Sequence, residues 1–361
     1  MKILYAIQGT GNGHLSRAEE VLPVLKKYAE VDVVISGKHA ELKLNHEVKF
    51  KYGGLGFIFG KKGGIDLKKS FLKNNLFRYF REIRKIPVKD YDLVINDFEP
   101  VSAWACFFRG VPCVSLSHQS AVISKNAPKS ELNDPLGWFF LKNYAPVQRS
   151  YGFHFETYDD STYTPIIRSD LRNSEVTNEG HYTVYLPAYS DKKIISFLEN
   201  FPKIKWEVFS KHTKKNYSKE NIKIRCVDAT FFKESLLKCE GVLCGAGFET
   251  PSEALFLRKK LLVVPMSNQF EQHCNAAALK AMGIPVIDSL NKRYLGVMKK
   301  FIKKSIPIAV NYADKTEKVV EKIISDHKNS KVSLEYEYLA KNLEQAMNAI
   351  SLNTLAGKLK Y

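Results

Sequence analysis

Paired cysteines are missing from this sequence. The chain of 361 residues has six cysteines, and none of them forms a Cys-x-x-Cys motif. They occur singly as Cys106, Cys113, Cys226, Cys239, Cys244 and Cys274. This spacing favours neither a zinc site nor a disulfide framework. It is typical of a protein that stays in a reducing cytoplasm.

Long hydrophobic runs are missing as well. Apolar runs such as AWACFF at 103–108 and GVLCGAGF at 241–248 are far too short to span a bilayer. The opening MKILYAIQGTG has no extended hydrophobic region and no small-residue cleavage site, so we expect no signal peptide. The predicted location is cytoplasmic, with peripheral contact at the inner face of the membrane as a further option.

Acidic residues are outnumbered by basic ones. The chain has 55 Lys and Arg against 38 Asp and Glu, which gives a formal net charge of +17. A field of this sign attracts nucleic acids, anionic lipid head groups or phosphorylated small molecules. We find no RNA-binding signature, zinc finger or helix-turn-helix pattern, so a nucleic-acid partner is not expected.

Strand-like and helix-like segments alternate along the chain. KILYAIQ at 2–8 precedes an amphipathic stretch at 16–29 and a second strand-like run at 31–36. The alternation fades into polar residues and turn formers near 155–180, and it restarts with YTVYLPA at 182–188. This order predicts an α/β fold, in which helices cover parallel sheets.

Two such sets predict two tandem Rossmann-like, doubly wound domains that face a cleft. In sheets of this kind, ligands bind beyond the carboxyl ends of the strands. The predicted boundaries are a first domain at 1–160, a linker at 161–180, a second domain at 181–330 and a helical tail at 331–361.

A glycine-rich turn, GTGNGH at 9–14, follows the first predicted strand. It lacks the third glycine of the dinucleotide fingerprint, no acidic residue ends the second strand, and no Gly-Lys-Ser/Thr follows. A plain strand-to-helix turn is the simplest alternative. His14 would lie at a helix start, where the helix dipole disfavours an extra proton. A neutral imidazole there can serve as a general base.

A second glycine turn, CGAGFET at 244–250, follows a later strand. Gly245 and Gly247 would let the backbone approach a ligand, and a helix from about Thr250 would direct free N–H groups at a pyrophosphate. Glu253, one turn into that helix, could accept hydrogen bonds from ribose hydroxyls, or it could be an ordinary solvated carboxylate. SNQFEQ at 267–272 offers amides and a carboxylate suited to sugar hydroxyls, unless it is only a polar loop.

At GTGNGHLSRA and at CGAGFETPSEAL to PMSNQFEQHCNA, the chain resembles the glycosyltransferases of the GT-B fold. The resemblance is closest to family 28, whose best-known member adds N-acetylglucosamine to the lipid-linked precursor of peptidoglycan. The chain is also similar to the UDP-glycosyltransferases of plants and antibiotic pathways. The resemblance implies two Rossmann-like domains, the first binding the acceptor and the second binding the nucleotide sugar.

The resemblance also implies a role for each matching residue. His14 matches the histidine that acts as general base in many relatives, and Asp97 stands where plant-type enzymes place an aspartate that orients it. Residues 247–250 would hold the donor pyrophosphate, and Glu271 and Gln272 the hydroxyls of its sugar. The full predicted donor set is Gly11, Gly13, Gly245, Gly247, Phe248, Glu249, Thr250, Glu253, Gln269, Glu271 and Gln272.

One position departs from the family pattern. Where relatives place a histidine or arginine beside the pyrophosphate, this chain has Gly245. The phosphate charge must then be met by backbone N–H groups or by a basic residue elsewhere. No Asp-x-Asp pair stands where a strand ends, so we expect neither a metal nor another cofactor.

The acceptor side is predicted from two stretches of the first domain. His118 and Gln119, in SLSHQS, are candidate acceptor-binding residues, although His118 could instead be a hydrogen-bonded histidine at a strand end. Between positions 60 and 90, ten Lys or Arg stand against three acidic residues, interleaved with aromatic and aliphatic ones. This segment could rest on an anionic membrane surface, or it could be an amphipathic helix that packs on the sheet.

These patterns lead to one function and two alternatives. We expect metal-independent, inverting transfer of a hexose or N-acetylhexosamine from a nucleotide sugar, with UDP as the expected nucleotide. The acceptor would be a hydroxyl group of a lipid-linked or cell-envelope glycan. One alternative is a catalytically silent GT-B module that recruits a partner to the membrane. The other, a sugar-nucleotide 2-epimerase, is disfavoured because its Gly-Thr-Arg-Pro-Glu opening is absent.

Overall fold

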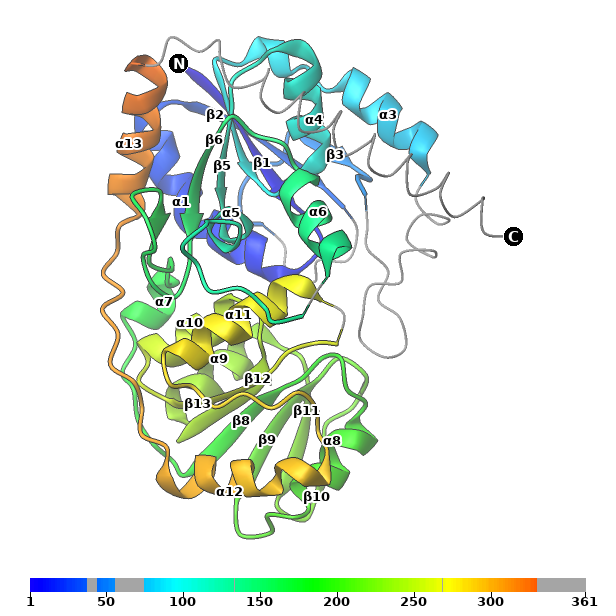
Figure 1. Cartoon of the computed structure of the whole chain (residues 1–361), viewed down its shortest axis with the longest axis vertical. Helices are drawn as coiled ribbons and strands as arrows, with labels where there is room; N and C mark the ends of the chain where they lie inside the picture. Colours follow the sequence, from blue (N-terminus) through cyan, green and yellow to red (C-terminus); the bar gives the residue numbers. More distant parts are fainter. Residues whose placement is uncertain (38–43, 56–74, 133, 268, 330–361) are drawn as a thin grey trace.

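Two sheets, each covered by helices, build the molecule and lie one above the other in Figure 1. The computed structural model describes residues 1–37, 44–55, 75–132, 134–267 and 269–329. The predicted α/β architecture with two Rossmann-like units is confirmed. Within the described ranges, no helix is long and apolar enough to cross a membrane.

The first sheet has seven parallel strands in the order β3-β2-β1-β4-β5-β6-β7. The strand order reverses beside β1, so the carboxyl ends of β1 and β4 flank a topological switch point, where such sheets bind ligands. The strands are β1 (Lys2–Gln8), β2 (Glu30–Ser36), β3 (Phe50–Tyr52), β4 (Leu93–Asp97), β5 (Cys113–Ser117), β6 (Arg149–Phe153) and β7 (Thr162–Tyr163).

Helices cover both faces of this sheet because its central strands are apolar on both sides. The residues from Ile3 to Ile7 are fully buried, as expected for a central parallel strand. Glu99 starts one of the covering helices by accepting the backbone N–H groups of Val101 and Ser102. The helices are α1 (Asn12–Tyr28), α3 (Leu76–Lys85), α4 (Pro100–Arg109), α5 (His118–Val122), α6 (Pro135–Asn143) and α7 (Ser169–Arg172), with a 3-10 turn at Val88–Asp90.

The second sheet has the order β10-β11-β9-β8-β12-β13, and only the edge pair β10 and β11 is antiparallel among its described strands. Its switch point lies between β8 and β12. The strands are β8 (His181–Tyr185), β9 (Lys205–Ser210), β10 (Tyr217–Lys219), β11 (Ile222–Cys226), β12 (Gly241–Gly245) and β13 (Lys260–Val264). Its helices are α8 (Asp191–Leu198), α9 (Ala229–Lys238), α10 (Glu249–Phe256), α11 (Phe270–Ala281) and α12 (Leu295–Lys304), with a 3-10 turn at Lys292–Tyr294.

The last described helix, α13 (Thr316–Asn329), returns to the first sheet and lies beside α1 (Figure 1). Lys27 on α1 pairs with Glu317 at 3.0 Å. The expected second domain at 181–330 therefore includes a helix that packs on the first, and we propose to assign residues 316–329 to the first domain. Strand β7 also reaches into the expected linker at 161–180.

Two connections join the units, one at 164–180 and one at 305–315. They are tied to each other, because the Arg172 side chain donates from Nη1 to the backbone oxygen of Tyr312 at 2.8 Å. The predicted helical tail at 331–361 lies outside the described residues, as does most of the basic segment between 60 and 75.

Candidate active site

The first glycine turn joins β1 to α1 at the switch point of the first sheet. Gly11 has a φ of 115°, a backbone conformation that residues with a side chain rarely adopt. A Cβ atom at Gly9 would lie 2.8 Å from the Ile35 side chain, so this glycine lets the turn pack against the end of β2. Gly13 faces the other way, and a Cβ there would lie 3.1 Å from the carboxylate carbon of Glu249. The turn is thus partly structural and partly a place of close approach to the second unit.

His14 and Asp97 meet above this turn. His14 is the third residue of α1, and Asp97 ends β4, which pairs with β1. The Nδ1 atom of His14 lies 2.8 Å from Oδ1 of Asp97. The His14 side chain is 12% exposed, and the Asp97 side chain is fully buried. The two residues predicted to form a catalytic pair are therefore brought together by the fold.

Arg17 completes this cluster, although we did not predict it from the sequence. It lies one turn after His14 on α1, and its side chain is only 3% exposed. Its Nε and Nη2 atoms donate to the two carboxylate oxygens of Asp97 at 3.1 and 2.8 Å. Burial alone would raise the pKa of the Asp97 carboxyl, but the charges of Arg17 and His14 hold it below the ordinary value. The i, i+3 spacing of Arg17 from His14 was the signal available in the sequence.

The second glycine turn leads from β12 into α10 at the switch point of the second sheet. A Cβ atom at Gly247 would meet nothing within 4 Å, and one at Gly245 would lie 3.7 Å from Gln272. No side chain caps the start of α10, where Glu249 and Thr250 form the first turn. The turn therefore offers open space and uncapped N–H groups, a combination that suits an anion.

Both acidic residues of α10 are paired with arginines from outside the second sheet. Glu249 accepts a hydrogen bond from Nη1 of Arg17 at 2.6 Å. Glu253, one turn later, accepts one from Nε of Arg168 at 2.7 Å. Burial raises the pKa of Glu253, and Arg168 opposes that shift. Glu253 is only 6% exposed, so the alternative of a solvated carboxylate is wrong.

The side chains of Glu271 and Gln272, at the start of α11, point in different directions. Glu271 reaches across to the first unit, where its Oε2 accepts from Nε2 of Gln119 at 3.1 Å. The Gln272 side chain turns back and accepts the backbone N–H of Met266 at 2.9 Å. The side-chain oxygens of Gln119 and Gln269 are buried and have no hydrogen-bond partner among the described residues. Both oxygens therefore have unused capacity to accept a hydrogen bond.

His118 and Phe248 pack against each other across the two units. Their rings stack with centroids 3.9 Å apart and planes 6° from parallel. The Nδ1 atom of His118 lies 2.7 Å from the Phe153 carbonyl oxygen, and Nε2 lies 2.8 Å from Oδ1 of Asn275. Burial lowers the pKa of His118, partly offset by nearby Glu271. With both ring nitrogens engaged, His118 fits the alternative of a hydrogen-bonded histidine at a strand end, and it links the two units. Phe248 stands directly before α10, in the predicted pyrophosphate turn. The acceptor role of His118 and the donor role of Phe248 stay predictions.

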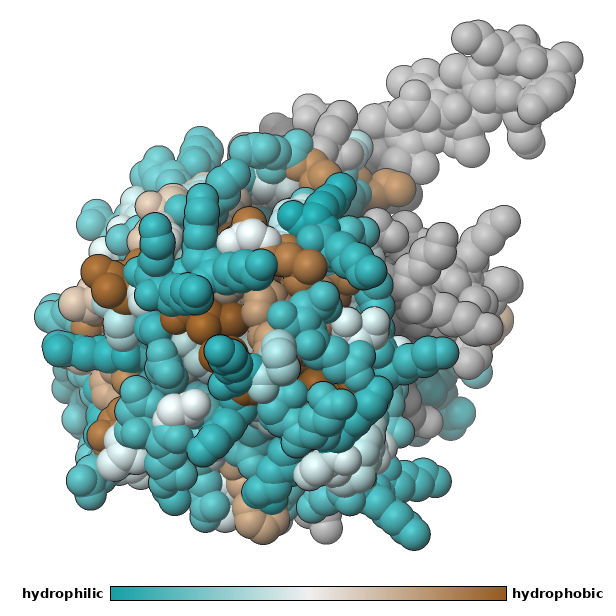
Figure 2. Space-filling view, turned by 90° about the horizontal axis from the view of Figure 1, so that it is seen from below, coloured by the Kyte–Doolittle hydropathy of each residue, from teal (hydrophilic) through white to brown (hydrophobic). Residues whose placement is uncertain are grey.

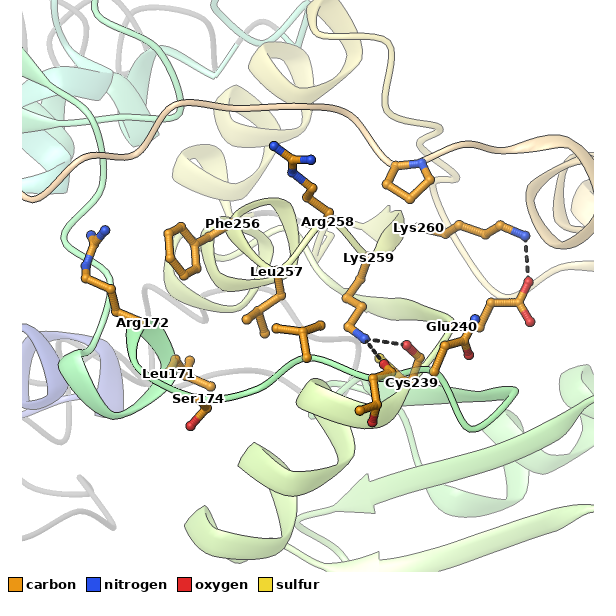
Figure 3. A pocket seen from close by; sticks show the side chains of 14 residues that line it. Leu171, Arg172, Ser174, Cys239, Glu240, Phe256, Leu257, Arg258, Lys259 and Lys260 are labelled. Carbon is orange, nitrogen blue, oxygen red and sulfur yellow. Dashed lines mark hydrogen bonds and ion pairs between the residues drawn. The ribbon is translucent and has the colours of Figure 1, made fainter.

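A hollow of about 770 Å³ lies elsewhere, at the amino ends of β12 and β13 (Figure 3). Lys259 donates there to the backbone oxygens of Thr177, Leu237 and Cys239. Lys260 pairs with Glu240 at 2.6 Å. Lys259 thus ties the connection at 164–180 to the second sheet, and the hollow lies at the opposite strand ends from the second glycine turn. No group of His, Cys, Asp and Glu able to hold a metal was found within the described ranges.

Comparisons with known proteins place this arrangement in a family. The model of glycosyl transferase family 1 matches residues 1–307. No curated protein sequence matches the chain. Among solved structures, the glycosyltransferase of kitacinnamycin is similar with a TM-score of 0.57 at 11% identity, covering 91% of this chain and 94% of the other.

Two further structures share the fold. The glycosyltransferase SsfS6 of Streptomyces sp. SF2575, complexed with thymidine diphosphate, has a TM-score of 0.54 at 13% identity and covers 90% of this chain and 99% of its own. UGT73P12 of Glycyrrhiza uralensis has a TM-score of 0.52 at 12% identity and covers 99% of this chain and 98% of its own. With the family model spanning most of its length, the chain belongs to glycosyl transferase family 1 and is a glycosyltransferase of the GT-B fold.

Proposed function

We propose that this glycosyltransferase moves a hexose or N-acetylhexosamine from UDP to a hydroxyl group of a lipid-linked or cell-envelope glycan. The reaction would be inverting and would need no metal. The observation that carries the proposal is the hydrogen bond between His14 and Asp97 at the switch point of the first sheet, opposite the uncapped start of α10.

His14 acts as the general base in this proposal. Nδ1 of His14 lies 2.8 Å from Oδ1 of Asp97, which can only accept, and 3.1 Å from Nη2 of Arg17, which can only donate. We assign the proton to Nδ1, in the shorter contact, so that Nε2 carries the lone pair. Nε2 takes the proton of the acceptor hydroxyl as its oxygen attacks the anomeric carbon. The bond from that carbon to the diphosphate breaks, and the diphosphate leaves with the electron pair. Asp97 stabilises the imidazolium that forms.

The donor occupies the carboxyl ends of the second sheet. The pyrophosphate lies at Gly245, Gly247 and Thr250, where the backbone is open and the N–H groups of α10 are uncapped. The second carboxylate oxygen of Glu253 contacts the ribose while the first stays with Arg168. The structural neighbour SsfS6 was solved with thymidine diphosphate, which supports a nucleoside diphosphate donor and makes dTDP the nucleotide to test against UDP.

The sugar and the acceptor meet between the units. Glu271 and the free oxygens of Gln119 and Gln269 supply contacts for hydroxyl groups. Gln272 holds the loop before α11 through Met266. Gly11 and Gly13 keep the first turn clear for both substrates.

A membrane surface is the proposed source of the acceptor. Helix α3 buries Tyr79 and Ile83 against the first sheet, whereas Phe77 is 92% exposed and Phe80 is 55% exposed. The exposed side of α3 also carries Arg81, Arg84 and Lys85. Exposed aromatic rings beside basic residues suit the interface of an anionic bilayer.

Transfer itself is the test. The protein is incubated with radiolabelled UDP, dTDP and GDP sugars and a membrane lipid extract, and the lipid and nucleotide fractions are separated. Label that moves into lipid supports the proposal and names the donor. Isomerised nucleotide sugar without transfer would point to an epimerase. Neither product, with intact nucleotide binding, would favour a silent binding module.

A further inference from the structure

Arg17 spans the space between the two units with a single guanidinium. Two of its nitrogens hold Asp97 on the first sheet, and the third, Nη1, holds Glu249 at the start of α10. The residue is only 4% exposed in the whole molecule. Its charge is therefore fixed beside the His14–Asp97 pair. Of its carboxylate partners, only Glu249 belongs to the other unit.

The Glu249 carboxylate occupies the position of an anion. It lies in the first turn of an uncapped helix, close to Gly13, where a Cβ atom would lie 3.1 Å from the carboxylate carbon, and within hydrogen-bond distance of Arg17. Carboxylate and phosphate oxygens bind the guanidinium fork with the same geometry. The Glu249 side chain is 25% exposed, so it has a route to solvent that Asp97 lacks.

The strand and turn that lead into α10 bring no cation to this place. Residues 241–248, which form β12 and the glycine turn, contain neither Lys nor Arg. A diphosphate at the start of α10 would face Glu249 as a like charge and Arg17 as the nearby opposite charge. Two anions cannot share the Nη1 atom of Arg17 without strong repulsion.

We propose that Arg17 is the positioning residue for the donor diphosphate. In the absence of the donor, the Glu249 carboxylate occupies the position of the diphosphate, and donor binding displaces it. This inference rests on the proposed function. The diphosphate takes the Nη1 contact, Glu249 moves to solvent, and Nε and Nη2 stay on Asp97. One guanidinium then links the leaving group to the carboxylate behind the catalytic base.

The experiment compares UDP with uridine, which lacks the diphosphate, by isothermal titration calorimetry. In Arg17→Gln, we expect UDP affinity to fall about 10- to 100-fold, as for a lost charged hydrogen bond, with uridine affinity unchanged. In Glu249→Gln, we expect UDP to bind more tightly, because the competing carboxylate is gone. Lys27→Gln is the matched control, since it removes one positive charge from the same helix at its pair with Glu317 and should change neither affinity.

The outcomes separate the inference from the function on which it rests. Equal losses for UDP and uridine in Arg17→Gln would show a merely structural arginine and overturn the inference. If Arg17→Gln does not fold, Glu249→Gln decides: tighter UDP binding supports the exchange, and unchanged or weaker binding refutes it. A wild-type protein that binds no UDP, dTDP or GDP would remove the proposed function and the inference together.

Discussion

The Nδ1 atom of His14 lies 2.8 Å from Oδ1 of Asp97, although 83 residues separate them in the chain. Parallel pairing of β1 with β4 brings their carboxyl ends to the same edge of the first sheet. In the proposed tautomer the proton is on Nδ1, towards Asp97, and Nε2 is left to a substrate. The chemistry predicted for this site depends on that contact.

Replacing His14 by alanine should remove the base and leave donor binding intact. We expect turnover to fall by about 10²- to 10⁴-fold, the usual contribution of a general base. UDP affinity should change little, because the proposed nucleotide site lies on the second sheet. Initial rates of sugar transfer and calorimetric titration with UDP measure the two effects. Transfer at the wild-type rate would leave the first turn a purely structural feature.

Asp97→Asn tests whether the pair acts as a unit. If it does, the double variant with His14→Ala should be scarcely slower than His14→Ala alone. The substitution also removes one of the two carboxylates that pair with the buried Arg17, while Glu249 stays, so the free energy of unfolding should fall by about 1.5–3 kcal/mol. Urea denaturation followed by circular dichroism measures this loss. Fully additive rate losses would argue against a shared role.

Acidification should reveal the lowered pKa of Asp97. In the folded chain, this carboxyl ionises below its ordinary pKa of 3.8, so the unfolded chain takes up the proton first as the pH falls. Its contribution to stability is present above about pH 4 and is lost below it. The free energy of unfolding of the wild type should therefore drop more steeply in this range than that of Asp97→Asn. Parallel curves for the two proteins would contradict the shift.

Two glycines should respond in opposite ways to alanine. Gly11→Ala forces a side chain into a conformation with a φ of 115°, so stability should fall by about 1–3 kcal/mol. Gly247→Ala adds a methyl group to open space, so stability should hold while UDP binding weakens. Thermal unfolding and UDP titration of both variants distinguish strain from close approach. Unchanged UDP affinity in Gly247→Ala would place the pyrophosphate elsewhere.

Helix α3 should carry the contact with membranes. We expect partial cosedimentation with anionic vesicles at low salt, with each basic residue contributing about 1 kcal/mol. Replacing Arg81, Arg84 and Lys85 by glutamine should release the protein. The control replaces Lys299, Lys300 and Lys303 on α12, on the side of the molecule that Figure 2 shows as mostly hydrophilic. Equal sedimentation of both variants would refute a specific role for α3.

The sequence was sufficient to predict the features that depend on local patterns. Buried apolar strands alternate with amphipathic helices, which predicts the doubly wound sheets, and the resemblance to plant-type glycosyltransferases pointed to Asp97 at the end of such a strand. Arg17 was missed because an arginine on a helix is normally solvated. Its burial follows from the position of Glu249, which lies 232 residues away.

Contacts between the units were beyond prediction for the same reason. His118 was expected at a strand end, either binding the acceptor or hydrogen-bonded, but its stacking on Phe248 of the other unit was not predicted. The return of α13 to α1 also depends on the path of the chain across both units, which no local periodicity records. Contacts of this kind depend on how the two folded units pack against each other, which the local sequence pattern does not encode.

The return of α13 has a mechanical consequence. The second unit is inserted between two parts of the first. Two crossings of the chain, at 164–180 and 305–315, therefore join it to the first unit. Because Arg172 of the first crossing donates to the Tyr312 carbonyl oxygen of the second, the two crossings are fastened to each other. A movement of the second unit against the first would therefore have to bend both crossings together.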